Sequence, residues 1–115
     1  MPTRSSVRQF IQDALDHCGN THTVGDVLKM VEDGKAALHV GDRCAVVTQE
    51  MELPAGRQLH YWLAGGDLDE LREIEKRVSD DAKQNGCTRA TIIGRRGWSK
   101  ALGYDEMATV MARTL

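Results

Sequence analysis

One long amphipathic segment constrains the fold of this chain more than any other feature of its sequence. Between Asp67 and Asn85 the apolar residues recur every three or four positions, as one helical stripe requires: Leu68, Leu71, Ile74, Val78 and Ala82. Asp67 or Asp69 is predicted to cap the start of this helix, and Asn85-Gly86 is predicted to end it. A helix with one apolar face needs an apolar surface to cover, and we expect a β-sheet to supply it.

The segments before this helix have the pattern of strands. Three of them are predicted to form an antiparallel meander: Ala36 to Val40, Arg43 to Gln49 and Gln58 to Ala64. Gly41-Asp42 is predicted to form a two-residue type II′ turn between the first two, and Pro54-Ala55-Gly56 a second turn. Gly65-Gly66 is expected to break the third strand, just before the long helix begins.

The segment after the helix, Cys87 to Ile93, is also predicted to be a strand. It should pair in parallel, because a strand, a crossover helix and a second strand in one sheet require that arrangement. A short helical piece around Gly97 to Leu102 and a last strand, Met107 to Arg113, are expected to follow. We predict that one group of apolar side chains packs between helix and sheet: Leu63, Leu71, Ile74, Val78, Ile92 and Val110.

The N-terminal part is predicted to be helical. Val7 to His17 has helical spacing, with Ser5 or Ser6 as the cap, and Thr23 is predicted to cap a second short helix with Asp26 as its capping-box partner. The fold class is therefore α/β (α+β): a mixed sheet in which an antiparallel meander is followed by a β-α-β crossover. We expect a single domain, 1–115, with a helical part, 1–33, and a part that holds the sheet and long helix, 34–115.

Composition excludes several classes of function. The formal net charge is -2, so no strong overall field attracts nucleic acid or an anionic membrane. The three cysteines, Cys18, Cys44 and Cys87, form no CxxC or CxxH pair, so we expect neither a metal site nor a disulfide framework. Cys44 and Cys87 lie in apolar runs and are predicted to be reduced core residues. The sequence shows no membrane-spanning stretch and no signal peptide, so we expect a cytoplasmic protein.

The order of the predicted elements resembles that of the GNAT family of N-acetyltransferases without its first strand. Leu59 to Gly66 looks like the central strand and its bulge, and Gly86 to Trp98 looks like the next strand and the start of the following helix. Gly103-Tyr104 lies where that family has a Gly-Phe or Gly-Tyr pair. More narrowly, Trp62 to Leu68 and Gly94 to Trp98 are similar to runs in small GNAT-like proteins of tailed phages and prophages. The resemblance covers about 34–115.

The resemblance implies a site for the acetyl-CoA pyrophosphate in the loop that precedes the long helix. The candidate cofactor-binding residues there are Leu63, Ala64, Gly65 and Gly66. However, no Arg or Gln precedes the glycines, and Asp67, Asp69 and Glu70 place negative charges where the anion would bind. Carboxylates at a helix start satisfy its N–H groups and repel anions. We therefore interpret this loop as a capped helix behind a strand bulge, and we expect no cofactor.

The residues expected to perform acetyl transfer are also incomplete. The resemblance implies a general acid five residues before the aromatic residue of the Gly-Tyr pair, which places Ser99 there, with Tyr104 as a further candidate. Glu50 and Glu52 are candidate bases on a strand. Both alternate with apolar residues, which favours a solvated strand face. Acetyl-CoA would be the cofactor only if the chain is an enzyme.

One basic cluster is a candidate anion-binding or partner-binding site. Arg89, Arg95, Arg96 and Lys100 lie close together in the sequence with Trp98 among them. Arginine beside an exposed aromatic ring can bind phosphate or stack on a base. An ordinary charged face with Trp98 in the core is the interpretation we favour.

Two functions remain open from the sequence. The first is a phage or prophage protein with a GNAT-like fold that lacks acetyl transfer and acts through contacts with a phage or host protein. It would lie in the host cytoplasm or be associated with the virion. The alternative is a small acyl-CoA-dependent N-acetyltransferase with an atypical cofactor loop. In neither case do we expect a membrane or nucleic acid as the partner.

Overall fold

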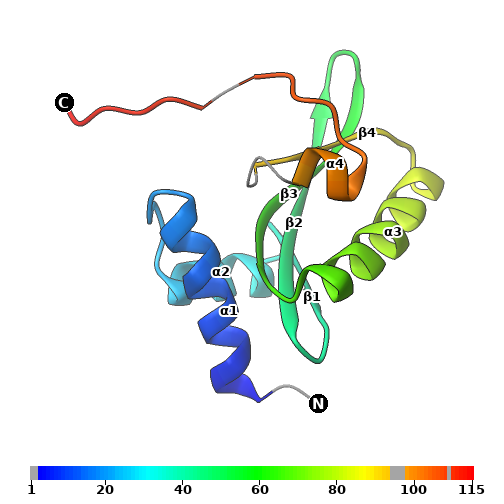
Figure 1. The fold of residues 1–115 in the computed structure, drawn as a ribbon. Coiled ribbons are helices and arrows are strands. Elements are labelled where there is room, and N and C mark those ends of the chain that lie inside the picture. The colour runs from blue at the N-terminus through cyan, green and yellow to red at the C-terminus, as the bar shows by residue number, and fades with distance from the viewer. Residues whose placement is uncertain (1–2, 94–97, 109) are drawn as a thin grey trace.

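The computed structural model describes residues 3–93, 98–108 and 110–115. A four-stranded mixed sheet lies at its centre, with helices on both faces (Figure 1). In chain order the elements are α1 (Arg4–His17), α2 (Val24–Glu32), β1 (Ala37–Val40), β2 (Cys44–Leu53), β3 (Gly56–Gly66), α3 (Leu68–Gln84), β4 (Cys87–Ile92) and α4 (Trp98–Leu102). The predicted mixed α/β fold is confirmed.

The strands lie in the order β1-β2-β3-β4. β1 pairs with β2 and β2 with β3 in antiparallel fashion, so the predicted meander is confirmed. β3 pairs with β4 in parallel, and α3 makes the crossover between them. The β-α-β unit was predictable, because two strands of one sheet that are joined by a crossover helix usually pair in parallel.

The helix boundaries follow from local capping. Asp67 caps α3 by accepting a hydrogen bond from the Glu70 N–H, and the helix ends at Asn85, as predicted. Thr23 and Asp26 form the predicted capping box of α2. The prediction for α1 was wrong in detail: Thr3, not Ser5 or Ser6, caps it, and its hydroxyl accepts the Ser6 N–H.

Each face of the sheet has its own hydrophobic cluster. On the α3 face, Leu71, Ile74 and Val78 pack with strand residues that include Tyr61, and Ile92 is partly buried beside them. On the other face, residues of α1 and α2 pack on Ala45, Val47 and Leu63. The first half of β2 is therefore buried on both sides, which explains its continuous apolar run. Cys44 lies in this core, and burial raises the pKa of its thiol to about 12.

A β-bulge corrects the prediction for Leu63. Val47 pairs with Leu63 and Thr48 pairs with Tyr61, so Trp62 is the extra residue in β3. An inserted residue shifts the alternation of side chains along a strand. Leu59 and Tyr61 consequently face α3, whereas Leu63 faces α1 and α2. Without the bulge, Leu63 would lie on the α3 face, as expected from strict alternation.

The turn between β1 and β2 also differs from the prediction. A type II′ turn needs a positive φ at its first central residue, and Gly41 is not among the glycines with positive φ. The turn is longer than expected, because β2 begins at Cys44 rather than Arg43. Glu70 of α3 lies against Gly41 and accepts the backbone N–H of Arg43 at 2.8 Å. A contact with a distant helix therefore determines the shape of this turn.

The predicted last strand is absent from the described residues. Within the predicted strand, Met107 to Arg113, the described residues belong to no helix or strand, and Val110 is 74% exposed instead of buried. Beyond Tyr104 the chain extends away from the sheet toward the end marked C (Figure 1). The apolar pattern was strand-like, but a strand also needs a partner edge. No helix among the described residues is long and apolar enough to cross a membrane.

Candidate functional site

The start of α3 is the place where the sequence resemblance puts an acetyl-CoA pyrophosphate. We expected Gly65 and Gly66, which precede it, to break the third strand, and this prediction was wrong, because β3 continues through both. Gly65 pairs with Ala45, and Gly66 pairs with Cys44. The strand ends only at Asp67, where the capping carboxylate turns the chain into the helix.

Close packing explains both glycines. A Cβ atom on Gly65 would overlap the backbone carbonyl of Phe10 in α1. A Cβ atom on Gly66 would overlap the carbonyl of Arg43 and the Cα of Cys44, and Gly66 also has a φ of +112°. Only glycine tolerates such contacts together with a positive φ. The two residues therefore allow α1 and the β1–β2 turn to approach β3.

Asp67, which caps α3, and Glu70 in its first turn connect the helix start to the β1–β2 turn. Glu70 Oε1 accepts the Arg43 N–H at 2.8 Å, and the Asp67 N–H donates to the Arg43 carbonyl at 2.9 Å. The Arg43 guanidinium lies 3.3 Å from Asp67 Oδ2 and 3.8 Å from Glu70 Oε2. These contacts occupy both acids, while Asp69 stays exposed beside them. The hydrogen bond from Arg43 is the main cause that lowers the pKa of Glu70.

This contact predicts a pH-dependent stability difference for Glu70→Gln. The folded state stabilises the charged carboxylate of Glu70, so the pKa of Glu70 lies below its ordinary value of 4.5. The carboxylate therefore contributes its full stabilisation of the fold above pH 4.5. The effect is lost as the pH falls through the lowered pKa. Thermal unfolding should therefore give a lower Tm for Glu70→Gln at pH 7, and the difference should shrink below pH 4.5.

The control for this prediction is Glu73→Gln, which makes the same change at an exposed position of α3. Its Tm should follow that of the unmodified protein across the same range. Equal Tm values for Glu70→Gln and the unmodified protein at pH 7 would show that the carboxylate does not hold the turn.

Tyr104 belongs to a polar network inside the fold. Its hydroxyl donates to Glu75 Oε1 at 2.8 Å, and the Ser79 hydroxyl donates to the same oxygen at 3.0 Å. The Tyr61 hydroxyl donates to the Glu75 carbonyl at 2.9 Å and lies 2.7 Å from Ser79 Oγ. Burial raises the pKa of Tyr61 to about 12 and also raises that of Tyr104. Both phenols therefore stay protonated at neutral pH. Tyr61 joins β3 to α3, and Tyr104 joins the chain after α4 to the same helix.

The candidate bases lie on the β2–β3 hairpin and bind an arginine. Glu50 Oε2 lies 3.2 Å from Arg57 Nη2, and Glu52 Oε1 lies 3.1 Å from Arg57 Nε, without the alignment of a hydrogen bond. Arg57 Nη1 also donates to the Asn85 carbonyl at 3.2 Å. Arg57 thus links two strands with the end of α3. The structure does not bring Glu50 or Glu52 into the networks of Tyr104 or the α3 start.

The basic cluster is described only in part. Arg95 and Arg96 lie outside the described residues, as does the side chain of Ser99 in α4. Trp98 is partly buried against the α3-side cluster, and Lys100 is exposed. The position of Trp98 agrees with the core role that we favoured for it. Anion binding by this cluster stays a hypothesis.

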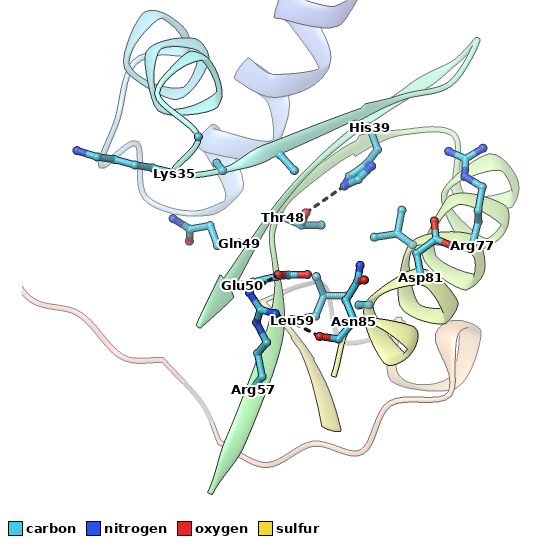
Figure 2. Close-up of a pocket in the computed structure, with 15 residues that line it drawn as sticks. Lys35, His39, Thr48, Gln49, Glu50, Arg57, Leu59, Arg77, Asp81 and Asn85 are labelled. Carbon is cyan, nitrogen blue, oxygen red and sulfur yellow. Dashed lines mark hydrogen bonds and ion pairs between the residues drawn. The ribbon is translucent and has the colours of Figure 1, made fainter. Parts of the chain in front are cut away.

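A cavity of about 430 Å³ lies beside edge strand β1, between the sheet and the C-terminal half of α3 (Figure 2). Its polar lining carries both signs of charge: Lys35, His39, Thr48, Gln49, Glu50, Arg57, Arg77, Asp81 and Asn85. Of these residues only Glu50 was a predicted site candidate. His39 points inward and its Nε2 lies 3.0 Å from Thr48 Oγ1. Burial, together with Arg77, lowers the pKa of His39, so the ring is neutral at pH 7.

The lining of this cavity has no clear preference for one ligand. Arg57 is already paired with Glu50, and the remaining charges, including Arg77 and Asp81, have opposite signs. His39 and His60 lie on different strands and do not form a pair of metal ligands. His39 contacts Thr48, and His60 Nδ1 lies 2.8 Å from Thr91 Oγ1. In the described part of the chain, no three His, Cys, Asp or Glu residues are grouped so that they could hold a metal ion.

Comparisons with protein-family models, with curated protein sequences and with solved structures gave no significant match to this chain.

Proposed function

We propose that this chain is a phage-type protein with a GNAT-like arrangement that has no acetyl transfer activity and acts through contacts with other proteins. Three features support the arrangement. The element order follows that of the resemblance as far as α4, β3 and β4 pair in parallel around α3, and Trp62 forms a bulge in the strand before α3.

The observation that carries the loss of acetyl transfer is the closed start of α3. Asp67 and Glu70 bind Arg43 of the β1–β2 turn, so this turn lies against the helix start at which the resemblance implies a pyrophosphate. An anion would have to displace this turn and remain close to Asp67, Asp69 and Glu70. Two like charges 4 Å apart repel by about 1 kcal/mol in water and by about 4 kcal/mol near a protein surface.

Contacts with proteins are supported by the exposed apolar side chains of the C-terminal segment. Met107 is 65% exposed, Val110 74% and Met111 87%. Single exposed apolar residues are common, but a run of them in one segment is typical of a binding surface.

Calorimetric titration with acetyl-CoA tests this proposal. We expect no binding tighter than about millimolar, which corresponds to about 4 kcal/mol. The double variant Asp67→Asn/Glu70→Gln should raise any residual affinity, because it releases the turn and removes two charges. Asp69→Asn is the matched control that removes one charge without releasing the turn, and its effect should be smaller.

Micromolar binding by the unmodified protein would contradict the proposal. It would favour the alternative, an acyl-CoA-dependent N-acetyltransferase with an atypical loop. An increase in affinity for Asp69→Asn as large as for the double variant would show that charge alone, and not the closed turn, opposes the anion.

A further inference from the structure

The large apolar side chains of the C-terminal segment, residues 105–108 and 110–115, are exposed. Met107, Val110, Met111 and Leu115 are all at least 65% exposed. The chain is anchored just before this segment by the hydrogen bond from Tyr104 to Glu75, and it then extends away from the sheet (Figure 1). The body of the protein therefore ends at Tyr104, and an apolar segment projects from it.

The sequence of this segment is that of a strand buried on both faces. Apolar residues fill most of the positions from Met107 to Ala112, as they do in the β2 run Cys44 to Val47, which is buried on both faces. A strand of this kind is fully stabilised only when both of its faces are removed from water. It is therefore suited to a place in a sheet that already has covering layers.

The sheet has a free edge that fits such a strand. β4 is the last strand in the sheet order, and within residues 3–93, 98–108 and 110–115 no strand pairs with its outer edge. It has 6 residues, whereas the other edge strand, β1, has 4. Ile93, directly after β4, is 45% exposed. An unpaired edge is a template for another strand.

We propose that the C-terminal segment of a second copy of this chain pairs with the outer edge of β4, and that the two copies exchange these segments reciprocally. The complementary features, an apolar strand without an edge and an edge without a strand, occur on the same chain. Reciprocal exchange satisfies both at once and closes the assembly as a symmetric dimer.

The size and charge of the contact suit a dimer. Each chain contributes the 6 residues of β4 and the residues 105–115, which approaches the roughly 20–30 residues a side of a standard interface. The net charge of -2 gives little repulsion between copies. This inference uses the same exposed side chains that support protein contacts in the proposed function and names a second copy of the chain as the partner, but it depends on neither acetyl-CoA nor a phage.

Light scattering after size-exclusion chromatography tests the exchange on three proteins. The intact chain should have about twice its mass of 12.7 kDa at high concentration. A chain that ends at Tyr104 should be a monomer with an unchanged circular dichroism spectrum, because the described residues that it loses, 105–108 and 110–115, are exposed and belong to no helix or strand. Met111→Asp, which keeps the full length, should also halve the mass.

The matched control is Met51→Asp, which places the same charge at a methionine that is 44% exposed on the hairpin of β2 and β3. This variant should remain a dimer. Hydrogen exchange should show protected amides in residues 110–113 of the intact protein.

Three results would overturn the proposal. They are a monomeric intact chain, a dimer that survives loss of residues 105–115, and dissociation by Met51→Asp but not by Met111→Asp. A monomer with protected amides in residues 110–113 would show that the segment pairs within its own chain.

Discussion

Ile74→Ala is expected to destabilise the protein by roughly 2–5 kcal/mol, because it leaves a cavity in the core between α3 and the sheet. Ile74 is 4% exposed and packs in the cluster that contains Tyr61 and Val78. In a domain with a total stability of about 5–15 kcal/mol, such a loss is large. Urea unfolding followed by circular dichroism measures it directly.

Leu68→Ala is the control for this prediction. Leu68 lies in the same helix and was part of the predicted stripe, but it is 39% exposed. Its replacement should therefore cost much less than that of Ile74. A loss below about 0.5 kcal/mol for Ile74→Ala, which is typical of surface changes, would show that the helix face is wrongly assigned.

Gly66→Ala is expected to produce the second large effect. The new methyl group would overlap the Arg43 carbonyl and the Cα of Cys44, and overpacking of this kind costs about 1–3 kcal/mol. The φ of +112° adds backbone strain of about 1–3 kcal/mol for any residue with a side chain. Unfolding in urea should show this loss with or without acetyl-CoA, because the role of the glycine is structural.

Gly25→Ala is the matched control for the glycine. Gly25 lies inside α2, where an added Cβ would meet only Thr23 Oγ1 at 3.7 Å, an ordinary contact. Alanine is favoured over glycine in a helix by about 0.5–1 kcal/mol, so this variant should be slightly stabilised. If Gly66→Ala were equally harmless, the tight packing of the turn against β3 would be refuted.

Features that depend on local sequence were predictable. The period of apolar residues gave α3, and the capping residues Asp67 and Thr23 gave two helix starts, because a cap is satisfied by its own neighbours. Features that depend on a distant partner were not. The resemblance implied a bulge in the third strand, but alternation alone does not reveal that it lies at Trp62. The turn at Gly41 lies against Glu70 of α3, a contact that no local pattern indicates.

The candidate sites follow the same division. The acidic start of α3 was visible in the sequence, but its pairing with Arg43 required the fold to bring the two together. Glu75 and Ser79 were not selected as site residues, although their spacing of four places them on one helix face. Their partner Tyr104 comes from a segment 29 residues away from Glu75, and no local signal identifies such a pair.

The closed start of α3 is the central claim, and amide NMR during addition of acetyl-CoA tests it most directly. If the contacts of Arg43 with Asp67 and Glu70 close the start of α3, no anion binds there. The amide signals of Gly65, Gly66 and Glu70 should then stay at the same positions up to millimolar acetyl-CoA. Saturable shifts of these signals at micromolar concentrations would contradict the account, because they would place the anion at the helix start that the β1–β2 turn occupies.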